Sequence, residues 1–416
     1  MEKELMVPIT WEDEMQPIIK VIGVGGGGCN AVSQMYKQGI KDVDFLICNT
    51  DAQALRSSGV PNKLQLGTLL TEGLGAGCNP EQGRKAALES IEQIEHNLRL
   101  GRTKMVFVTA GMGGGTGTGA TPVIAEVAKT LGMLTIGVVT LPFKDECIET
   151  YRRAIDGIQE LEKHVDSLII IENQKIYEIY ENLKVFDAFP KIDEVLSRAV
   201  KGIAEIITQS GYVNVDFADV KMVMQNSGQA LMGTGVASGE GRAIEAVKEA
   251  FFSPLLNNFD LKTAKRVLIN ITSSREYGLE VSELQQIMEY IKEYTGLADN
   301  VKRGVVIDDS LGETISVTVI AAGFKKSPLP NVSDTWGGGQ NRIILDEINF
   351  ESDQIKIETF TEYSEAENNR SFVEHKFNNS IPITVYSDNS LFREYEEEPA
   401  IFRREKMKRT EMPEIL

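Results

Sequence analysis

Two glycine-rich runs constrain this chain more than any other feature of its sequence. Each one follows a short apolar segment typical of a β-strand and precedes a segment with helical periodicity. The first run is GVGGGG at 23–28, after IIKVI, and the second is GMGGGTGTG at 111–119, after MVFVTA. Glycines at such a junction let backbone N–H groups at a helix N-terminus approach a phosphate closely, because no Cβ intervenes. Either run alone is typical of a tight βα turn, but the two together predict two anion sites.

The two anion sites could belong to a nucleotide-phosphate-binding protein or to a dinucleotide-binding oxidoreductase. Neither run contains GxxxxGK[ST], so the Walker P-loop is excluded and we expect a magnesium ion to neutralise the phosphates. Gly23, Gly25 and Gly28 also spell the GxGxxG fingerprint of dinucleotide-binding proteins, for which Asp44 or Asp51 could bind the ribose. A nicotinamide-dependent oxidoreductase is therefore an alternative. It does not explain the second glycine run, and no His/Lys/Tyr constellation is visible in the second half of the chain.

The apolar segments predict an α/β fold with a doubly wound parallel sheet. DFLICNT, KMVFVTA, LTIGVVTL and SLIIIE are nearly continuous in apolar residues, as expected for parallel strands covered on both faces, and helical segments separate them. At 191–210, Val195, Ala199 and Ile203 recur at four-residue spacing, which predicts one buried helix of roughly 30 Å. The strands and helices that follow predict a smaller second α/β domain.

A chain of 416 residues is too long for one compact core, so we expect several regions. The polar composition of 325–392 predicts a disordered linker. Near the end, Ile401 and Phe402 stand beside Arg403 and Arg404, which suggests a partner-binding helix. The predicted regions are an N-terminal tail at 1–17, a nucleotide-binding domain at 18–190, a central helix at 191–213, a C-terminal α/β domain at 214–324, the linker at 325–392 and a partner-binding tail at 393–416.

Charge and composition exclude several function classes. The 61 acidic residues outnumber the 43 basic ones and give a formal charge of −18, which disfavours nucleic acid as a partner. The sequence shows neither a secretory signal nor an apolar run of about 18 residues, so we expect a soluble cytoplasmic protein with no direct membrane insertion. The four cysteines form no CxxC pair and the three histidines lie far apart, which argues against a disulfide framework and a zinc site.

Five motifs occur here in the order found in one known family. GVGGGGCNAV, NTDAQAL, LGAGCNP, GMGGGTGTGA and NVDFADV resemble the FtsZ family, the tubulin-like GTPases of bacterial cell division, over about residues 18–324. The resemblance implies a GTPase that binds GTP and GDP and assembles head to tail into filaments of the division ring at midcell, beneath the inner membrane. It also implies Mg²⁺, with K⁺ as a further candidate. PAIFRR resembles the family's C-terminal peptide, which implies that 396–409 binds an FtsA-like membrane adaptor and other division proteins.

The resemblance also assigns nucleotide-binding roles to individual residues. Asn173 would contact the ribose, while Phe189 would stack on the guanine and Asp193 would hydrogen-bond to it. A carboxylate can accept bonds from both N1–H and N2–H₂ of guanine, a donor pattern that adenine lacks; alternatively, Asp193 is an ordinary acid in the first turn of a helix. The full set implied is Gly26, Gly27, Gly28, Cys29, Asn30, Gly75, Ala76, Gly77, Gly113, Gly114, Gly115, Thr116, Gly117, Thr118, Glu146, Asn173, Phe189 and Asp193.

The catalytic residues implied by the resemblance lie in the loop 214–220. Asp216 and Asp219 would orient the attacking water and bind a cation, and Asn214 would add a polar contact. The long helix before this loop carries it away from the subunit's own nucleotide, so the loop would complete the pocket of the next subunit in a filament. The alternatives are two solvated acids in a surface loop, or a filament protein that does not hydrolyse nucleotide.

The sequence departs from the family pattern at several positions. Cys29, Cys78 and Cys147 stand where the family usually has glycine. Exposed thiols beside helix N-termini would have lowered pKa values, although small side chains could simply be tolerated there. Glu146 of the family's FEGxxR motif is present, but the arginine position is Thr150, for which Arg152 or Arg153 could substitute from the next turn.

Overall fold

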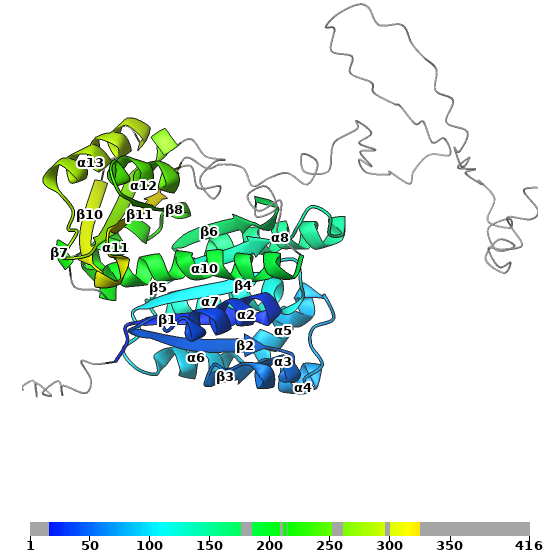
Figure 1. Cartoon of the computed structure of the whole chain (residues 1–416). Coiled ribbons are helices and arrows are strands. Elements are labelled where there is room, and N and C mark those ends of the chain that lie inside the picture. Colours follow the sequence, from blue (N-terminus) through cyan, green and yellow to red (C-terminus); the bar gives the residue numbers. More distant parts are fainter. Residues whose placement is uncertain are drawn as a thin grey trace, which may run out of the picture. The chain divides into compact units, whose positions relative to one another are not determined.

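The computed structural model describes residues 16–175, 185–208, 211–213, 215–251, 261–295 and 300–324, with only the backbone for 185–189 and for 261 (Figure 1). The predicted linker at 325–392, the tail at 393–416 and nearly all of the N-terminal tail lie outside these residues. No helix in the described ranges combines the length and apolar character needed to cross a membrane.

Six parallel strands form the first part of the sheet and confirm the predicted doubly wound fold. They lie in the order β3-β2-β1-β4-β5-β6. The chain runs outward from β1 to β3 and then crosses back to β4 on the other side of β1, so the strand order reverses between the neighbouring strands β1 and β4. In open α/β sheets, ligands bind beside the carboxyl ends of the strands at such a switch point. The strands are β1 (Ile19–Val24), β2 (Val43–Asn49), β3 (Asn62–Gln65), β4 (Met105–Gly111), β5 (Leu134–Leu141) and β6 (Ser167–Glu172).

Helices cover both faces of these strands. On one face, α2 (Gly25–Lys37) and α10 (Val185–Thr208) pack on strand residues such as Val21. On the other, α5 (Pro80–Glu89), α6 (Ile91–Arg99), α7 (Thr116–Thr130) and α8 (Ile148–His164) pack on alternate residues such as Ile22. The short helices α3 (Ala52–Ser57) and α4 (Thr68–Thr71) lie in connections. Burial on both faces explains why the strands inside the sheet are largely apolar, whereas the edge strand β3 is not.

The central helix α10 differs from the expected range at both ends. It begins at Val185, before the predicted start at 191, and Pro190 lies inside it. Proline usually marks a helix boundary because it lacks an N–H group and restricts the residue before it, which is why the sequence indicated a later start. At the other end, Gly211–Val213 forms the strand β7 instead of helix, because it pairs antiparallel with β10.

The second half of the chain is a mixed α/β unit whose strands continue the same sheet. β8 (Gly228–Ser238) and β9 (Arg266–Ser273) both pair antiparallel with β11 (Thr314–Ala322), and β9 pairs parallel with β10 (Asn300–Ile307). Its helices are α11 (Phe217–Met224), α12 (Arg242–Phe251) and α13 (Val281–Thr295), with short 3₁₀ turns at Leu261–Thr263 and Asp309–Leu311. Two residue pairs between β6 and β8 join the halves into one eleven-stranded sheet.

Candidate nucleotide site and catalytic loop

The structure brings three loops together at the carboxyl edge of the parallel strands: the two glycine runs at 23–28 and 111–119, and a third glycine loop formed by LGAGCNP at 74–80. A Cβ added to Gly25 would lie 2.7 Å from the backbone nitrogen of Gly117, so the first two loops touch through their backbones. A Cβ on Gly115 would lie 2.9 Å from both the Ala76 Cβ and the Asn79 nitrogen, so the third loop packs against the second. A larger residue at Gly25 or Gly115 would force these loops apart. Glycine is therefore required at both positions for the loops to converge.

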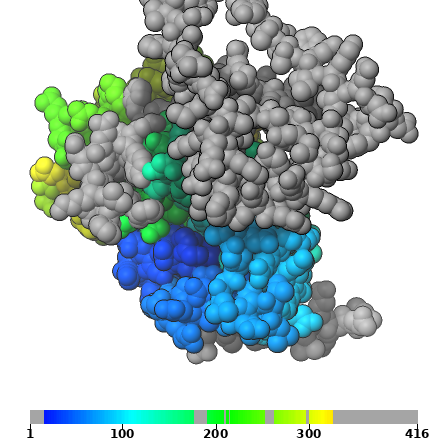
Figure 2. All heavy atoms as spheres, turned by 90° about the vertical axis from the view of Figure 1, so that its right-hand side faces the viewer, coloured from blue at the N-terminus to red at the C-terminus, as the bar shows by residue number. Residues whose placement is uncertain are grey.

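The open side of this junction is suited to an anion. Gly26 and Gly114 have no heavy atom within 4 Å of the position that a Cβ would take. The helices that follow, α2 and α7, have no side-chain hydrogen bond at their N-caps and no acidic residue in their first turns. Their first N–H groups are thus available for phosphate oxygens. Figure 2 looks onto this end of the molecule, where the dark-blue surface of the earliest described segment adjoins the lighter-blue surface of the segments that follow it.

The two threonines of the second loop are used inside the protein. The Thr118 hydroxyl accepts a hydrogen bond from the Gly113 N–H at 2.8 Å, and the Thr116 hydroxyl lies 2.7 Å from the hydroxyl of Thr50. Both side chains are buried. They brace the loop in its conformation, and their role as donors to a phosphate stays a prediction.

The third loop has an unusual backbone. Gly75, Gly77 and Cys78 have φ values of +92°, +56° and +57°, a region that favours glycine. Cys78 therefore holds a conformation that glycine adopts far more readily, at a position where the resemblance implies glycine. Asn79 then caps α5 by accepting the Glu81 N–H at 3.0 Å, which fixes the loop to that helix.

Three connections place the predicted ribose and guanine residues near one another. The Phe143 N–H donates to a carboxylate oxygen of Glu146 at 3.0 Å, which folds the segment after β5 into a turn. The Lys144 N–H donates to the side-chain oxygen of Gln174 at 3.2 Å, beside the end of β6. The Phe143 ring packs against Ile192 of α10. The segment that carries Glu146 thus contacts the neighbours of both Asn173 and Asp193.

Asn173 and Asp193 offer acceptors that suit a nucleoside. Asn173 is buried, with 9 % of the residue exposed, and its Oδ1 has no hydrogen-bond partner. Burial raises the pKa of the half-buried Asp193 carboxyl to about 6. Donors from a ribose hydroxyl and from guanine would satisfy both groups. Asp193 also lies well inside α10, so it is not an acid of a helical first turn. The side chain of Phe189 lies outside the described residues.

The structure favours one of the two arginines proposed to replace the residue missing at Thr150. Arg153 donates to the Thr150 hydroxyl at 3.1 Å, and a Cβ on Gly113 would lie 2.7 Å from the Thr150 methyl group, so this threonine touches the second loop. Arg152 instead pairs with Glu149 at 2.9 Å on the exposed side of α8. Arg153 is therefore the better-placed candidate.

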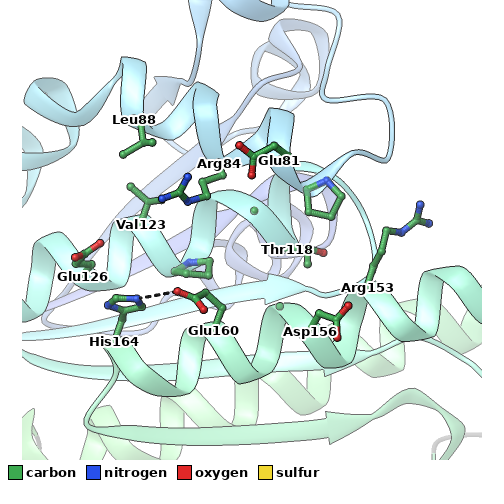
Figure 3. A pocket seen from close by; sticks show the side chains of 14 residues that line it. Glu81, Arg84, Leu88, Thr118, Val123, Glu126, Arg153, Asp156, Glu160 and His164 are labelled. Atoms are coloured by element: carbon green, nitrogen blue, oxygen red, sulfur yellow. Dashed lines mark hydrogen bonds and ion pairs between the residues drawn. The ribbon is translucent and has the colours of Figure 1, made fainter. Parts of the chain in front are cut away.

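A separate pocket of about 280 Å³ lies between α5, α7 and α8 (Figure 3). Arg84 lines it from α5, Val123 from α7, and Arg153 from α8. His164 lies at its edge, 3.4 Å from Glu160. Among the residues predicted to bind nucleotide, only Thr118 lines this pocket. It is thus distinct from the open side of the glycine loops.

The cysteine at the first loop is not a reactive thiol. The Cys29 side chain is buried, and its Sγ points toward the carbonyl oxygens of Gly23 and Cys48, at 3.7 and 3.6 Å. Burial raises the pKa of this thiol to about 12. Cys29 can therefore contribute only its backbone to a phosphate site, whereas Cys78 and Cys147 are exposed.

The predicted catalytic carboxylates are at the other end of α10. From Asp193 the helix continues to Thr208, a rise of about 22 Å. Asp216 and Asp219 follow at the start of α11, which Figure 1 shows at the opposite end of α10 from α5. They cannot reach a nucleotide held by the glycine loops of the same chain. Asn214 lies outside the described residues.

Both carboxylates already have partners. One oxygen of Asp216 accepts the Asp219 N–H at 2.8 Å and caps α11. One oxygen of Asp219 lies 2.7 Å from the Lys302 ammonium group, an ion pair that the sequence did not indicate because the two residues lie far apart in it. The described residues contain no group of three or more side chains suited to a metal ion. The pair does not fit a resident metal site, since Lys302 takes the place of a cation at Asp219.

The oxidoreductase alternative finds no support in the geometry. Asp44 lies near the amino end of β2, away from the glycine loops, and pairs with the buried Lys20 at 3.0 Å. Asp51 caps α3 by accepting the N–H groups of Gln53 and Ala54. Asp44 therefore lies at the wrong end of its strand for a ribose beside the first loop, and one oxygen of Asp51 is used to cap α3.

Comparison with known proteins gives a consistent result. A family model described as "Tubulin/FtsZ family, GTPase domain" matches residues 18–181, and one described as "FtsZ family, C-terminal domain" matches 228–325. The cell division protein FtsZ of Pseudomonas putida is 50% identical over 309 residues, which cover 74% of this chain and 77% of that protein. The FtsZ of Wigglesworthia glossinidia brevipalpis is 41% identical over 387 residues, which cover 93% and 96%.

Solved structures show the same similarity. An empty FtsZ dimer from M. jannaschii superposes with a TM-score of 0.69 at 39% identity, over 76% of this chain and 93% of that one. A GTPγS-bound CetZ2 protofilament from Haloferax volcanii has a TM-score of 0.65 at 20% identity, over 74% and 94%. The second likeness concerns the fold alone.

Proposed function

The chain belongs to the tubulin/FtsZ family of GTPases, and from this premise we propose that it assembles into division-ring filaments and hydrolyses GTP between subunits. One observation carries the proposal. The converging glycine loops and the carboxylates of Asp216 and Asp219 occupy opposite ends of α10, so one chain holds two halves of a site. Head-to-tail contact between two chains would join the halves.

In the proposed complex, each subunit binds GTP with the residues at the carboxyl edge of its sheet. The N-termini of α2 and α7 receive the phosphates, Asn173 the ribose, and Asp193 the guanine. No lysine stands in either glycine run, so a magnesium ion bound with the nucleotide would neutralise phosphate charge. Support comes from the open side of Gly26 and Gly114 and from the unpartnered Oδ1 of Asn173.

Hydrolysis then depends on the neighbouring subunit. Asp216 and Asp219 each have a second carboxylate oxygen with which to orient water toward the γ-phosphorus. The water oxygen forms a bond to that phosphorus as the bond to the β–γ bridging oxygen breaks, which releases phosphate and leaves GDP. Positioning and electrostatics account for most of such catalysis. A subunit on its own lacks this contribution and should hydrolyse GTP slowly.

Exposed apolar side chains support head-to-tail contact. Leu69 and Leu74, beside the third glycine loop, are 85% and 86% exposed. Tyr212 of β7 is 79% exposed and Val301 of β10 is 43% exposed, and these strands neighbour the catalytic loop. These side chains are available to pack across a contact between chains, and two different surfaces on one chain give a heterologous contact that can propagate.

The proposal extends to the partners and the location of the filament. By its resemblance to the family's C-terminal peptide, the segment 396–409 would bind an FtsA-like membrane adaptor and other division proteins. Such a tether would hold the cytoplasmic filament at midcell beneath the inner membrane. This segment lies outside the described residues.

Right-angle light scattering, measured together with phosphate release in GTP, GDP and ATP, tests the proposal. We expect scattering and phosphate release with GTP, and little of either with GDP or ATP. Equal responses to ATP and GTP would contradict the assigned guanine contact. Assembly in GTP without phosphate release would favour a filament protein that does not hydrolyse nucleotide.

A further inference from the structure

The contact between Asp219 and Lys302 joins the catalytic loop to a strand from a distant part of the chain. The Lys302 ammonium lies 2.7 Å from one Asp219 oxygen, and the side chains are 41% and 26% exposed. Asp219, with Asp216 as a lesser contributor, raises the pKa of Lys302, so the ammonium group is charged at neutral pH. The pair is accessible enough to enter an interface and is held together in the free subunit.

The strand β10 is shaped to present Lys302 to this loop. A Cβ on Gly304 would lie 3.0 Å from a methyl group of Val215, so the face of β10 that carries Gly304 packs against the residue just before Asp216. Lys302 lies two residues earlier and therefore on the same face. Arg303 lies between them, is exposed and belongs to the opposite face. The glycine lets the loop approach the strand, and the lysine then reaches Asp219.

The charge of the loop gives this contact a consequence for hydrolysis. Without Lys302, Asp216 and Asp219 would bring two negative charges toward the triphosphate of the neighbouring subunit. Charges only a few ångströms apart are separated by less than the Debye length of about 8–10 Å, so salt screens them weakly. The ammonium group cancels one of the two charges and fixes one oxygen of Asp219, which leaves the other oxygen for water.

We propose that Lys302 is a positioning residue for GTP hydrolysis. Its ammonium group holds Asp219 and enters the neighbouring subunit's nucleotide pocket with the catalytic loop. There it supplies the positive charge beside Asp219 that a bound metal ion would otherwise supply. This inference rests on the proposed function, because it requires the loop of one subunit to act on the nucleotide of the next.

The test compares Lys302→Met, which removes the charge but keeps an unbranched side chain, with Lys302→Arg, which keeps the charge. Arg303→Met is the matched control, since it removes a neighbouring cation from the other face of the same strand. For Lys302→Met we expect kcat to fall by about 10- to 100-fold, the cost of a misplaced catalytic group. GDP affinity should change by less than about twofold, because the subunit's own nucleotide site is untouched, and kcat is compared at protein concentrations where light scattering has reached its plateau for each variant. Lys302→Arg should recover most of the turnover.

Two results would overturn the inference. Lys302→Met could turn over GTP as fast as Arg303→Met, or it could lose GDP binding together with turnover, as a purely structural residue would. Asp219→Asn separates this failure from a failure of the proposed function. If Asp219→Asn is inactive while Lys302→Met is normal, only the role of Lys302 is wrong. If Asp219→Asn also hydrolyses GTP normally, the proposed catalytic loop itself is wrong.

Discussion

The affinity for guanine nucleotide should depend on pH through Asp193. Burial raises the pKa of this carboxyl to about 6 in the free protein. Only the ionised carboxylate can accept hydrogen bonds from both N1–H and N2–H₂ of guanine. Nucleotide binding therefore lowers the pKa of Asp193 and requires the loss of a proton below pH 6. The affinity for guanine nucleotide therefore falls as the pH falls through the pKa of Asp193 in the free protein.

The size of the effect follows from that pKa. If nucleotide binds only the ionised form, the apparent Kd scales with the term 1 + 10^(pKa − pH). With a pKa of about 6, this term rises from about 1.1 at pH 7 to about 11 at pH 5, a tenfold loss of affinity worth about 1.4 kcal/mol. An aspartate with an ordinary pKa near 3.9 would lose only about 1.1-fold over the same range.

Isothermal titration calorimetry with GDP at pH 5, 6 and 7 measures this directly, because GDP avoids hydrolysis and filament growth. Asp193→Asn is the control, since it has nearly the same shape but does not titrate. The phosphates of GDP titrate equally in both experiments, so the ratio of the two affinities isolates Asp193. The wild-type affinity should fall about tenfold more than that of the variant between pH 7 and pH 5. The same pH dependence in both proteins would refute the assignment of Asp193 to the guanine.

Three further perturbations test other parts of the account. Asp216→Asn keeps a residue that can cap α11 but removes a charge, so it should bind GTP normally and release little phosphate; normal phosphate release would remove Asp216 from the mechanism. Arg242→Met breaks the pair with Glu283 at 2.8 Å, so urea unfolding should show a loss of about 3 kcal/mol, most of it recovered in the double variant Arg242→Met/Glu283→Leu. An unchanged urea midpoint would contradict this. Truncation after Ser390 should leave turnover and scattering intact but abolish recruitment to adaptor-coated vesicles, and equal recruitment would show that the tail does not tether.

The parallel half of the fold could be predicted because its physical signals are local. Strands buried on both faces are nearly continuous in apolar residues, as LTIGVVTL is in β5, and glycines are needed after a strand where two loops meet backbone to backbone. The strand β3 was missed because its sequence, Asn62–Gln65, is short and mostly polar. It lies at the edge of the sheet and pairs only with β2, so the environment did not demand an apolar sequence.

The features that escaped prediction depend on contacts between distant residues. No local pattern could pair Lys302 with Asp219, because the contact exists only once β10 packs beside the loop. The inward orientation of Cys29 depends on the carbonyl of Cys48 in a neighbouring strand. The early start of α10 overrides the local preference of Pro190. Sequence motifs thus indicate which loops form the site, whereas only the structure shows which residues orient the side chains of that site.

The central claim is that one chain holds two halves of a GTPase site, and it predicts how activity depends on protein concentration. The measurement is the initial rate of phosphate release at saturating GTP, from dilute samples to concentrations that scatter light strongly. Specific activity should be very low in dilute samples and rise with concentration, because each nucleotide needs the loop of a neighbour. A specific activity that stays constant down to the most dilute samples would show that Asp216 and Asp219 act within a single chain, or that they do not act at all.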